Sequence, residues 1–138
     1  MAEAAAVKMS FPGGRQVVAT IGDHSVLTDQ PVEAGGGGGA MSPYSLFLAS
    51  IGACAGFFVL RFCQSREISM EGIEVTATPR KGDDGVLAGV DIRLQVPADF
   101  PARYHTALIR AVEQCSVKRA IQAQPSFDVE LFTGEAAP

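Results

Sequence analysis

The sequence predicts an α+β fold in which antiparallel strands pack around one long central helix. Three observations support this class: a strand meander precedes the helix, a β-hairpin follows it, and an amphipathic helix with a last strand closes the chain. Hydrophobic residues make up 47% of the chain, which argues against disorder, and 138 residues are expected to form a single domain, residues 1–138.

The N-terminal meander is expected at residues 7–11, 15–21 and 24–28, where apolar and polar residues alternate between glycine-containing turns. Residues 29–41 then form a loop with five consecutive glycines, Gly35–Gly39. This run lacks the lysine and Ser/Thr ending of a phosphate-binding P-loop, and no strand leads into it. We therefore interpret it as a flexible connector to the central helix.

The central helix is expected from about Pro43 to Gln64, with Ser42 as its cap and proline at the first helical position. Its residues are apolar on every side, which is typical of a helix that is buried all round or lies in a membrane. The uncharged stretch, residues 44–60, is 17 residues long. Because a spanning helix needs roughly 20 apolar residues, we favour a buried central helix over a transmembrane one.

Gly52 and Gly56 lie about one helical turn apart, so both can let another backbone approach closely. We predict that two central helices meet there in a homodimer. The alternative is that both glycines pack against the sheet of their own chain.

After the central helix, residues 72–78 and 90–96 alternate as two strands joined by a turn at 82–85, which predicts a β-hairpin. A helix follows from about residue 101 to before Pro125, either continuous or restarted near residue 117. Its apolar stripe consists of Tyr104, Leu108, Ala111 or Val112, and Cys115. A last strand is expected at 127–131, before a tail at 133–138.

Charge and cysteine usage exclude several classes of function. The net charge of −4 and the pI near 5.1 argue against a nucleic-acid partner. The N-terminus does not resemble a signal peptide, so we expect a cytoplasmic protein. Three cysteines without tight spacing do not form a disulfide framework, and cytosolic cysteines that function are catalytic or redox-sensing.

Cys54, in the middle of the central helix, and Cys115, on the later helix, are the candidate working residues. Cys54 and Cys63 project from opposite sides of one helix about 13 Å apart, whereas a disulfide needs Cα atoms within about 7 Å. Any pair must therefore include Cys115, and Cys54, set among small residues, is its better partner. Cys63 is expected to be a packed thiol, and the alternative for the other two is that they are inert core thiols.

A reactive thiol needs a lowered pKa, and Cys54 is too deep in its own helix to benefit from the N-terminal dipole. We therefore expect a cation beside it, either Arg61 or Arg15; the alternative is that each arginine is a solvated surface charge. His24, His105 and the cysteines have no zinc-ligand spacing, so no metal is expected. A Cys–His hydrolase using His105 has no sequence signature.

Residues 42–54, Ser-Pro-Tyr-Ser-Leu-Phe-Leu-Ala-Ser-Ile-Gly-Ala-Cys, resemble the cysteine helix of the OsmC/Ohr family. Residues 71–75 resemble the strand that follows it there, and residues 115–119 resemble the family's second-cysteine motif, usually Cys-Pro-Val. Thr-Asp-Gln-Pro at 28–31, before the glycine-rich loop, also fits. The order of elements matches across nearly the whole chain.

The resemblance implies an intertwined homodimer that reduces hydroperoxides, preferably organic ones, at a site at each end of the interface. Cys54 would attack the peroxide and become a sulfenic acid, Cys115 would resolve it as a disulfide, and a dithiol reductant would reopen that disulfide. No cofactor is implied.

Three positions depart from the peroxidase branches of the family and indicate a divergent branch. Tyr44 stands where those branches carry a glutamate, Ser116 replaces the proline after the second cysteine, and Arg15 is a loose match for their catalytic arginine. The alternative function is a non-catalytic dimer that binds a small apolar ligand, with Phe57, Phe58 and Tyr44 as candidate lining.

Overall fold

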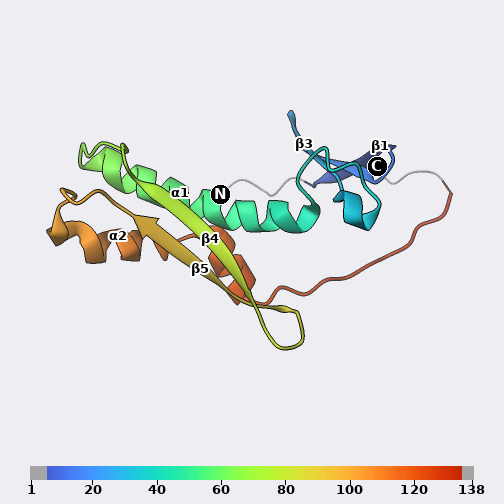
Figure 1. Cartoon of the computed structure of the whole chain (residues 1–138). Helices are drawn as coiled ribbons and strands as arrows, with labels where there is room; N and C mark the ends of the chain where they lie inside the picture. Colours follow the sequence, from blue (N-terminus) through green and yellow to red (C-terminus); the bar gives the residue numbers. More distant parts are fainter. Residues whose placement is uncertain (1–5, 135–138) are drawn as a thin grey trace.

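The computed structural model describes residues 6–134, so the ends of the predicted domain and the last four residues of the predicted tail lie outside it. An antiparallel three-stranded sheet sits at the start of the long helix α1, and a β-hairpin lies along that helix (Figure 1). This arrangement confirms the α+β class. The strands and the helix are β1 (Lys8–Gly13), β2 (Gln16–Ile21), β3 (His24–Thr28), α1 (Pro43–Ser65), β4 (Glu74–Lys81) and β5 (Leu87–Gln95).

The start of α1 follows from its capping residues. The Ser42 hydroxyl oxygen accepts the backbone N–H of Ser45 at 3.1 Å, and Pro43 occupies the first helical position, where no N–H is needed. The predicted cap is confirmed, and α1 runs one residue beyond the predicted end.

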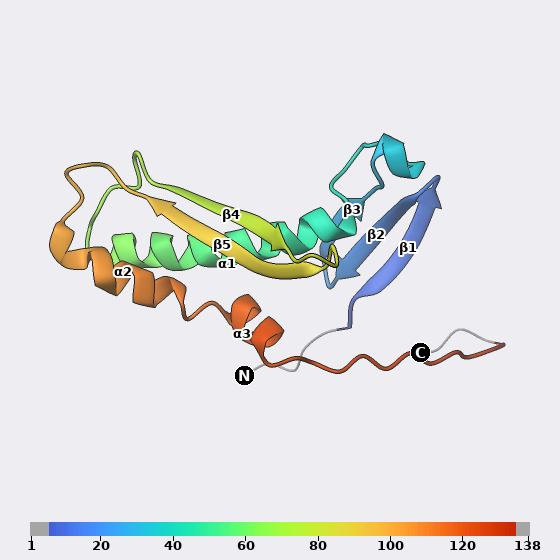
Figure 2. The ribbon, with the colours of Figure 1, turned by 60° about the horizontal axis from the view of Figure 1, so that its bottom comes forward.

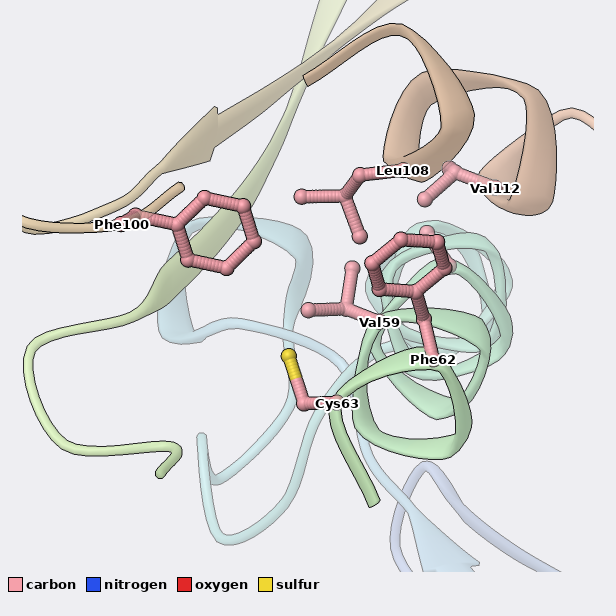
Figure 3. Close-up of a cluster of buried hydrophobic side chains, with 7 residues drawn as sticks. Val59, Phe62, Cys63, Phe100, Leu108 and Val112 are labelled. Carbon is pink, nitrogen blue, oxygen red and sulfur yellow. The ribbon is translucent and has the colours of Figure 1, made fainter. Parts of the chain in front are cut away.

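One face of α1 forms the core of the molecule. Ala55, Val59 and Cys63 expose no surface and recur at four-residue spacing along this face. They pack with Leu108 and other buried side chains of the neighbouring elements, among which Cys63 lies with its sulfur directed into the cluster (Figure 3). Cys63 is thus the packed thiol that the sequence predicts.

The expectation that α1 is buried all round is wrong for the single chain, because the face opposite the core is uncovered. Phe57 on that face is 54% exposed. The two helix glycines differ accordingly. A Cβ at Gly52 would lie 3.7 Å from Cβ of Ala77 in β4, whereas one at Gly56 would meet nothing within 4 Å. Gly52 therefore packs on the chain's own sheet, and only Gly56 faces open space.

By length and mean hydropathy, which reaches 2.0, α1 is apolar enough to cross a membrane. Its inner face packs against β4 and the helix α2 (His105–Val112), as in the core helix of a globular domain.

The loop at residues 29–41 is a fixed structure and not the predicted flexible connector. Its base is closed by the N–H of Asp29, which donates to the carbonyl of Met41 at 3.2 Å. The buried Asp29 carboxylate accepts the N–H groups of Gln30 at 2.7 Å, Gly39 at 3.1 Å and Gly37 at 3.4 Å. The loop also contains a short 3-10 turn, η1 (Val32–Ala34), and glycine is required at Gly36 because a Cβ there would overlap the Gln30 backbone.

The second helical region is interrupted. Of the two predicted alternatives, the structure therefore has the helix that restarts and not the continuous one. It comprises the turn η2 (Ala102–Tyr104), then α2, and then α3 (Ser116–Gln122). The interruption separates Val112 from Cys115 without a proline between them.

The strand predicted at 127–131 is not formed. These residues are extended but pair with no strand among residues 6–134, and the chain leads them away from the body of the molecule (Figure 2). Phe127 and Val129 are 88% and 97% exposed. An alternating pattern gives a strand only where another strand offers ladder hydrogen bonds, and residues 6–134 of the single chain offer none here.

Replacing the carboxylate of Asp29 by an amide is expected to destabilise the loop. The N–H groups of Gly39 and Gln30 hold the pKa of Asp29 below its ordinary value, against the opposing effect of burial. Asp29→Asn should lower the thermal midpoint at pH 7 by several degrees, because the charge-assisted bonds are lost. The exposed control Asp23→Asn should leave it unchanged.

The same pair of variants gives a pH test. Since the folded pKa of Asp29 lies below the unfolded one, its stabilisation is fully present above about pH 4 and is lost as the pH falls through the folded value. Urea unfolding at pH 7 and at pH 3 should therefore show a smaller pH effect in Asp29→Asn than in the native chain. Equal pH effects in both proteins would contradict this role.

Candidate functional site

The break between α2 and α3 brings Cys115 to Cys54. Cys54 lies in the middle of α1, next to the buried Ala55, and is half-buried. Cys115 caps α3, exposes no surface, and its sulfur accepts the N–H of Lys118 at 3.4 Å. The two thiols are 61 positions apart in the sequence but lie within hydrogen-bonding reach of each other, and both are free.

The surroundings of Cys54 favour its thiolate. Burial alone would raise the pKa of Cys54, but hydrogen bonds from the Cys115 thiol and from the N–H of Val117 lower it, and both the hydroxyl and the N–H of Ser116 add to this. The Cys54 sulfur lies 4.0 Å from the Ser116 hydroxyl oxygen. Together these donors outweigh desolvation, so the pKa of Cys54 lies below its ordinary value.

The other two thiols are shifted in the opposite direction. Burial raises the pKa of Cys115, and the neighbouring Cys54 raises it further. Burial also raises the pKa of Cys63, although the charge of Arg66 opposes this. Of the three thiols, Cys54 alone has a lowered pKa, so it is the one that most readily loses its proton.

Among residues 6–134 of the single chain, no contact joins Cys54 to either predicted arginine, so a cation beside Cys54 stays a prediction. Arg15 lies in the turn between β1 and β2, where its guanidinium approaches Gly35 of the glycine loop, and Arg61 is exposed on α1. Neither arginine is among the main causes of the lowered pKa of Cys54. Tyr44 lies in the first turn of α1, its ring 6.1 Å from that of Phe47, and the fold does not bring it to the thiols.

Sequence reasoning missed Ser116 and Val117 as the groups that act on Cys54. The available signal was their position: they directly follow Cys115, at a point where the helix was expected to restart. The first N–H groups of a restarted helix have no partner inside that helix, so they are free to point at a neighbouring thiolate.

An apolar groove of about 780 Å³ runs between β5, α2 and α3. From α1 it is lined by Phe47 and Ile51, the latter one helical turn before Cys54. Lys118, which contacts the Cys115 sulfur, also lines it. Phe57, Phe58 and Tyr44 do not line this groove. The pocket expected for them lies between the helices of a dimer and stays a prediction.

Within residues 6–134, no group of three or more His, Cys, Asp or Glu side chains is placed to hold a metal ion.

Comparison with known proteins follows this geometry. Residues 35–130 match the family model of the OsmC-like protein family. None of the proteins with curated descriptions matches the chain significantly in sequence.

Three solved structures illustrate the likeness of fold. A candidate osmotic stress induced and detoxification response protein from Psychrobacter arcticus 273-4 is 19% identical, with a TM-score of 0.70 over 87% of this chain and 90% of that one. An OsmC like protein from Mycoplasma pneumoniae is 11% identical, with a TM-score of 0.68 over 90% and 91%. An organic hydroperoxide resistance protein from Elizabethkingia anophelis is 20% identical, with a TM-score of 0.55 over 90% and 93%.

Removing donors from Ser116 is expected to make Cys54 less reactive. Ser116→Ala removes the hydroxyl and should slow alkylation of Cys54 at pH 7 by about twofold, since a smaller fraction is thiolate. Ser116→Pro also removes the N–H, fits the first position of α3, and should slow alkylation further. The measurement is the rate of iodoacetamide modification of Cys54 against pH, followed by peptide mass spectrometry.

Ser50→Ala is the matched control, because the Ser50 hydroxyl bonds only to the Phe47 carbonyl within α1. If Ser116→Pro alkylated as fast as the native chain, Ser116 would have no part in activating Cys54.

Proposed function

The chain belongs to the OsmC-like protein family, and we propose that it is a thiol-dependent peroxidase that reduces organic hydroperoxides. The observation that carries this proposal is the asymmetric thiol pair, in which the pKa of Cys54 is lowered and that of Cys115 is raised. A peroxidatic thiol must be a thiolate at neutral pH, whereas its resolving partner has to lose its proton only when it attacks the sulfenic acid, whose hydroxyl takes up that proton as it leaves. The name of the Elizabethkingia relative, an organic hydroperoxide resistance protein, supports the same chemistry.

The reaction has two steps in this chain. The Cys54 thiolate attacks the terminal peroxide oxygen, the O–O bond breaks, and the alkoxide leaves and takes a proton to become an alcohol, which leaves Cys54 as a sulfenic acid. The Cys115 sulfur then attacks the Cys54 sulfur, a disulfide forms, and the hydroxyl leaves as water. A dithiol reductant returns both residues to thiols, and its two sulfurs become a disulfide.

Each role fits the surroundings of its residue. The N–H and hydroxyl groups of Ser116 can stabilise the Cys54 thiolate without a cation, and the Cys115 thiol is already within reach for the second step. The apolar groove is lined by Ile51, one turn before Cys54, and by Lys118, whose N–H contacts the Cys115 sulfur, and it can take the hydrocarbon part of an organic hydroperoxide.

The working form in this proposal is an intertwined homodimer. Large apolar side chains are exposed on three separate elements of the single chain: Phe57 on α1, Phe11 on β1 and Val129 in the extended C-terminal segment. Uncovered apolar surface of this extent is typical of an interface. A second copy could cover the open face of α1 and offer a strand edge to the C-terminal segment. Arg15 and Tyr44 could then reach the thiols of the partner. A soluble, cytoplasmic location is part of the same proposal.

The apolar groove also favours a second candidate function, a dimer that binds a small apolar ligand and turns nothing over. The two candidate functions differ in one observable result: a hydroperoxide oxidises the thiols of a peroxidase and leaves those of a binding protein unchanged.

We expect one equivalent of cumene hydroperoxide to consume two thiols per chain and to link Cys54 to Cys115. In Cys115→Ser, Cys54 should be trapped as a sulfenic acid, which a dimedone probe detects, and turnover with a dithiol should stop after one cycle. The matched variant Cys63→Ser should keep full turnover, because Cys63 lies in the core away from the pair. Three free thiols after peroxide treatment of the native chain would reject the peroxidase and leave the binding protein.

The dimer proposal is tested at Gly56. Gly56→Leu fills a space that is open in the single chain, so it should not destabilise the fold, but it should block close approach of a second α1 and weaken dimerisation at least about tenfold. Sedimentation velocity across a dilution series measures the effect, and Asp83→Leu in the exposed β4–β5 turn is the control. A native chain that is monomeric throughout would reject the dimer.

A further inference from the structure

A second concave site lies between α1 and α2, away from the apolar groove. It has a volume of about 560 Å³, and four arginines line it: Arg61, Arg66, Arg103 and Arg110. We refer to it as the arginine groove. It holds four of the eleven lysine and arginine residues of a chain whose net charge is −4.

The charges of the arginine groove have no acidic partners. No aspartate or glutamate lines it, and among residues 6–134 the only salt bridge joins Arg80 to Asp91 on the β4–β5 hairpin. Four like charges that converge on one concave surface repel each other, and the repulsion is relieved when an anion binds between them.

Arg66 is already held in place within the arginine groove. One terminal nitrogen, Nη1, donates to the Phe62 carbonyl at 3.2 Å and to the Ser65 hydroxyl at 3.0 Å. The guanidinium carbon lies 3.6 Å from the centre of the Phe62 ring. The other N–H groups of this guanidinium make no hydrogen bond to the described residues, so a fixed donor edge is available to an oxyanion.

Arg103 is positioned by the same aromatic cluster. Its guanidinium carbon lies 4.7 Å from the centre of the Tyr104 ring, and that of Arg66 lies 5.4 Å from the same ring. Two of the four cations are thus held by stacking, which reduces the entropy that a ligand must remove on binding.

The remaining lining indicates the kind of anion. Thr106 and Gln114 add neutral hydrogen-bonding groups, while Phe58, Ala107 and Ala111 give apolar walls. The volume lies in the range of small-molecule sites, about 300–1,000 Å³. A second copy centred on this groove is a poor occupant, because a two-fold axis through the groove would bring eight like charges together.

We propose that the arginine groove binds a small organic molecule that carries two or more phosphate or carboxylate groups. Each guanidinium can engage an oxyanion through two parallel N–H donors, so one molecule with two such groups would use all four arginines. This site is separate from the thiol pair, and its occupancy does not depend on whether the chain is a peroxidase.

Isothermal titration calorimetry of the full chain in low-salt buffer tests the proposal with two probes, inorganic pyrophosphate and citrate. We expect at least one of them to bind with one site per chain. Binding of pyrophosphate alone would assign phosphate groups to the ligand, and binding of citrate alone would assign carboxylates. In Arg61→Gln/Arg110→Gln, affinity should fall at least about tenfold, since two charge-assisted contacts are removed.

The matched control is Lys81→Gln/Arg93→Gln, which removes the same charge from exposed positions on the hairpin. It should bind within about twofold of the native chain, because long-range attraction is weaker than direct contact. Circular dichroism checks that both variants are folded. The proposal is overturned if the native chain binds neither probe, or if the control loses as much affinity as the groove variant.

Discussion

The packing of one face of α1 against β4 and α2 is the constraint on which the rest of this structure depends. Ala55, Val59 and Cys63 have no exposed surface, so the rotation of α1 about its axis is fixed. That rotation places Cys54, next to Ala55, at the margin of the core. The same contacts hold α2 beside α1, and the interruption after α2 carries Cys115 to Cys54. The meeting of Cys54 with Cys115 therefore follows from core packing.

The thiol pair obtains its asymmetry from hydrogen-bond donors in a half-buried position. N–H groups at the start of a helix can stabilise a thiolate without a neighbouring cation, which would itself have to be desolvated and held in place. The same donors matter at two of the positions, Tyr44 and Ser116, where the chain departs from the family pattern. A chain with Tyr44 in place of a glutamate can still lower the pKa of its first cysteine, because Ser116 offers two donors where proline would offer none. Four arginines gather instead on α1, η2 and α2, away from Cys54.

Local features were predictable from the sequence, and features that depend on distant partners were not. The meander, the Ser42 cap, the hairpin and the helix restart all follow from residue patterns within a few positions. The lowered pKa of Cys54 depends on Cys115, Val117 and Ser116, which lie more than 60 positions away in the sequence. The apolar composition of the Gly56 face of α1 and of residues 127–131 predicts that both are buried, but in the single chain both are uncovered. Composition alone does not indicate whether the surface that covers them belongs to the same chain or to another.

The bonds of Asp29 turn the glycine run into a spacer of fixed length. In a flexible connector no residue makes a specific contact, so inserting or deleting one residue has little effect on the stability of the fold. Here the carboxylate engages Gly37 and Gly39, and Gly36 fits against the Gln30 backbone. One inserted residue would present the wrong groups to the carboxylate and would displace the start of α1 from β3. Insertions and deletions in this segment are therefore constrained as strictly as those within a strand.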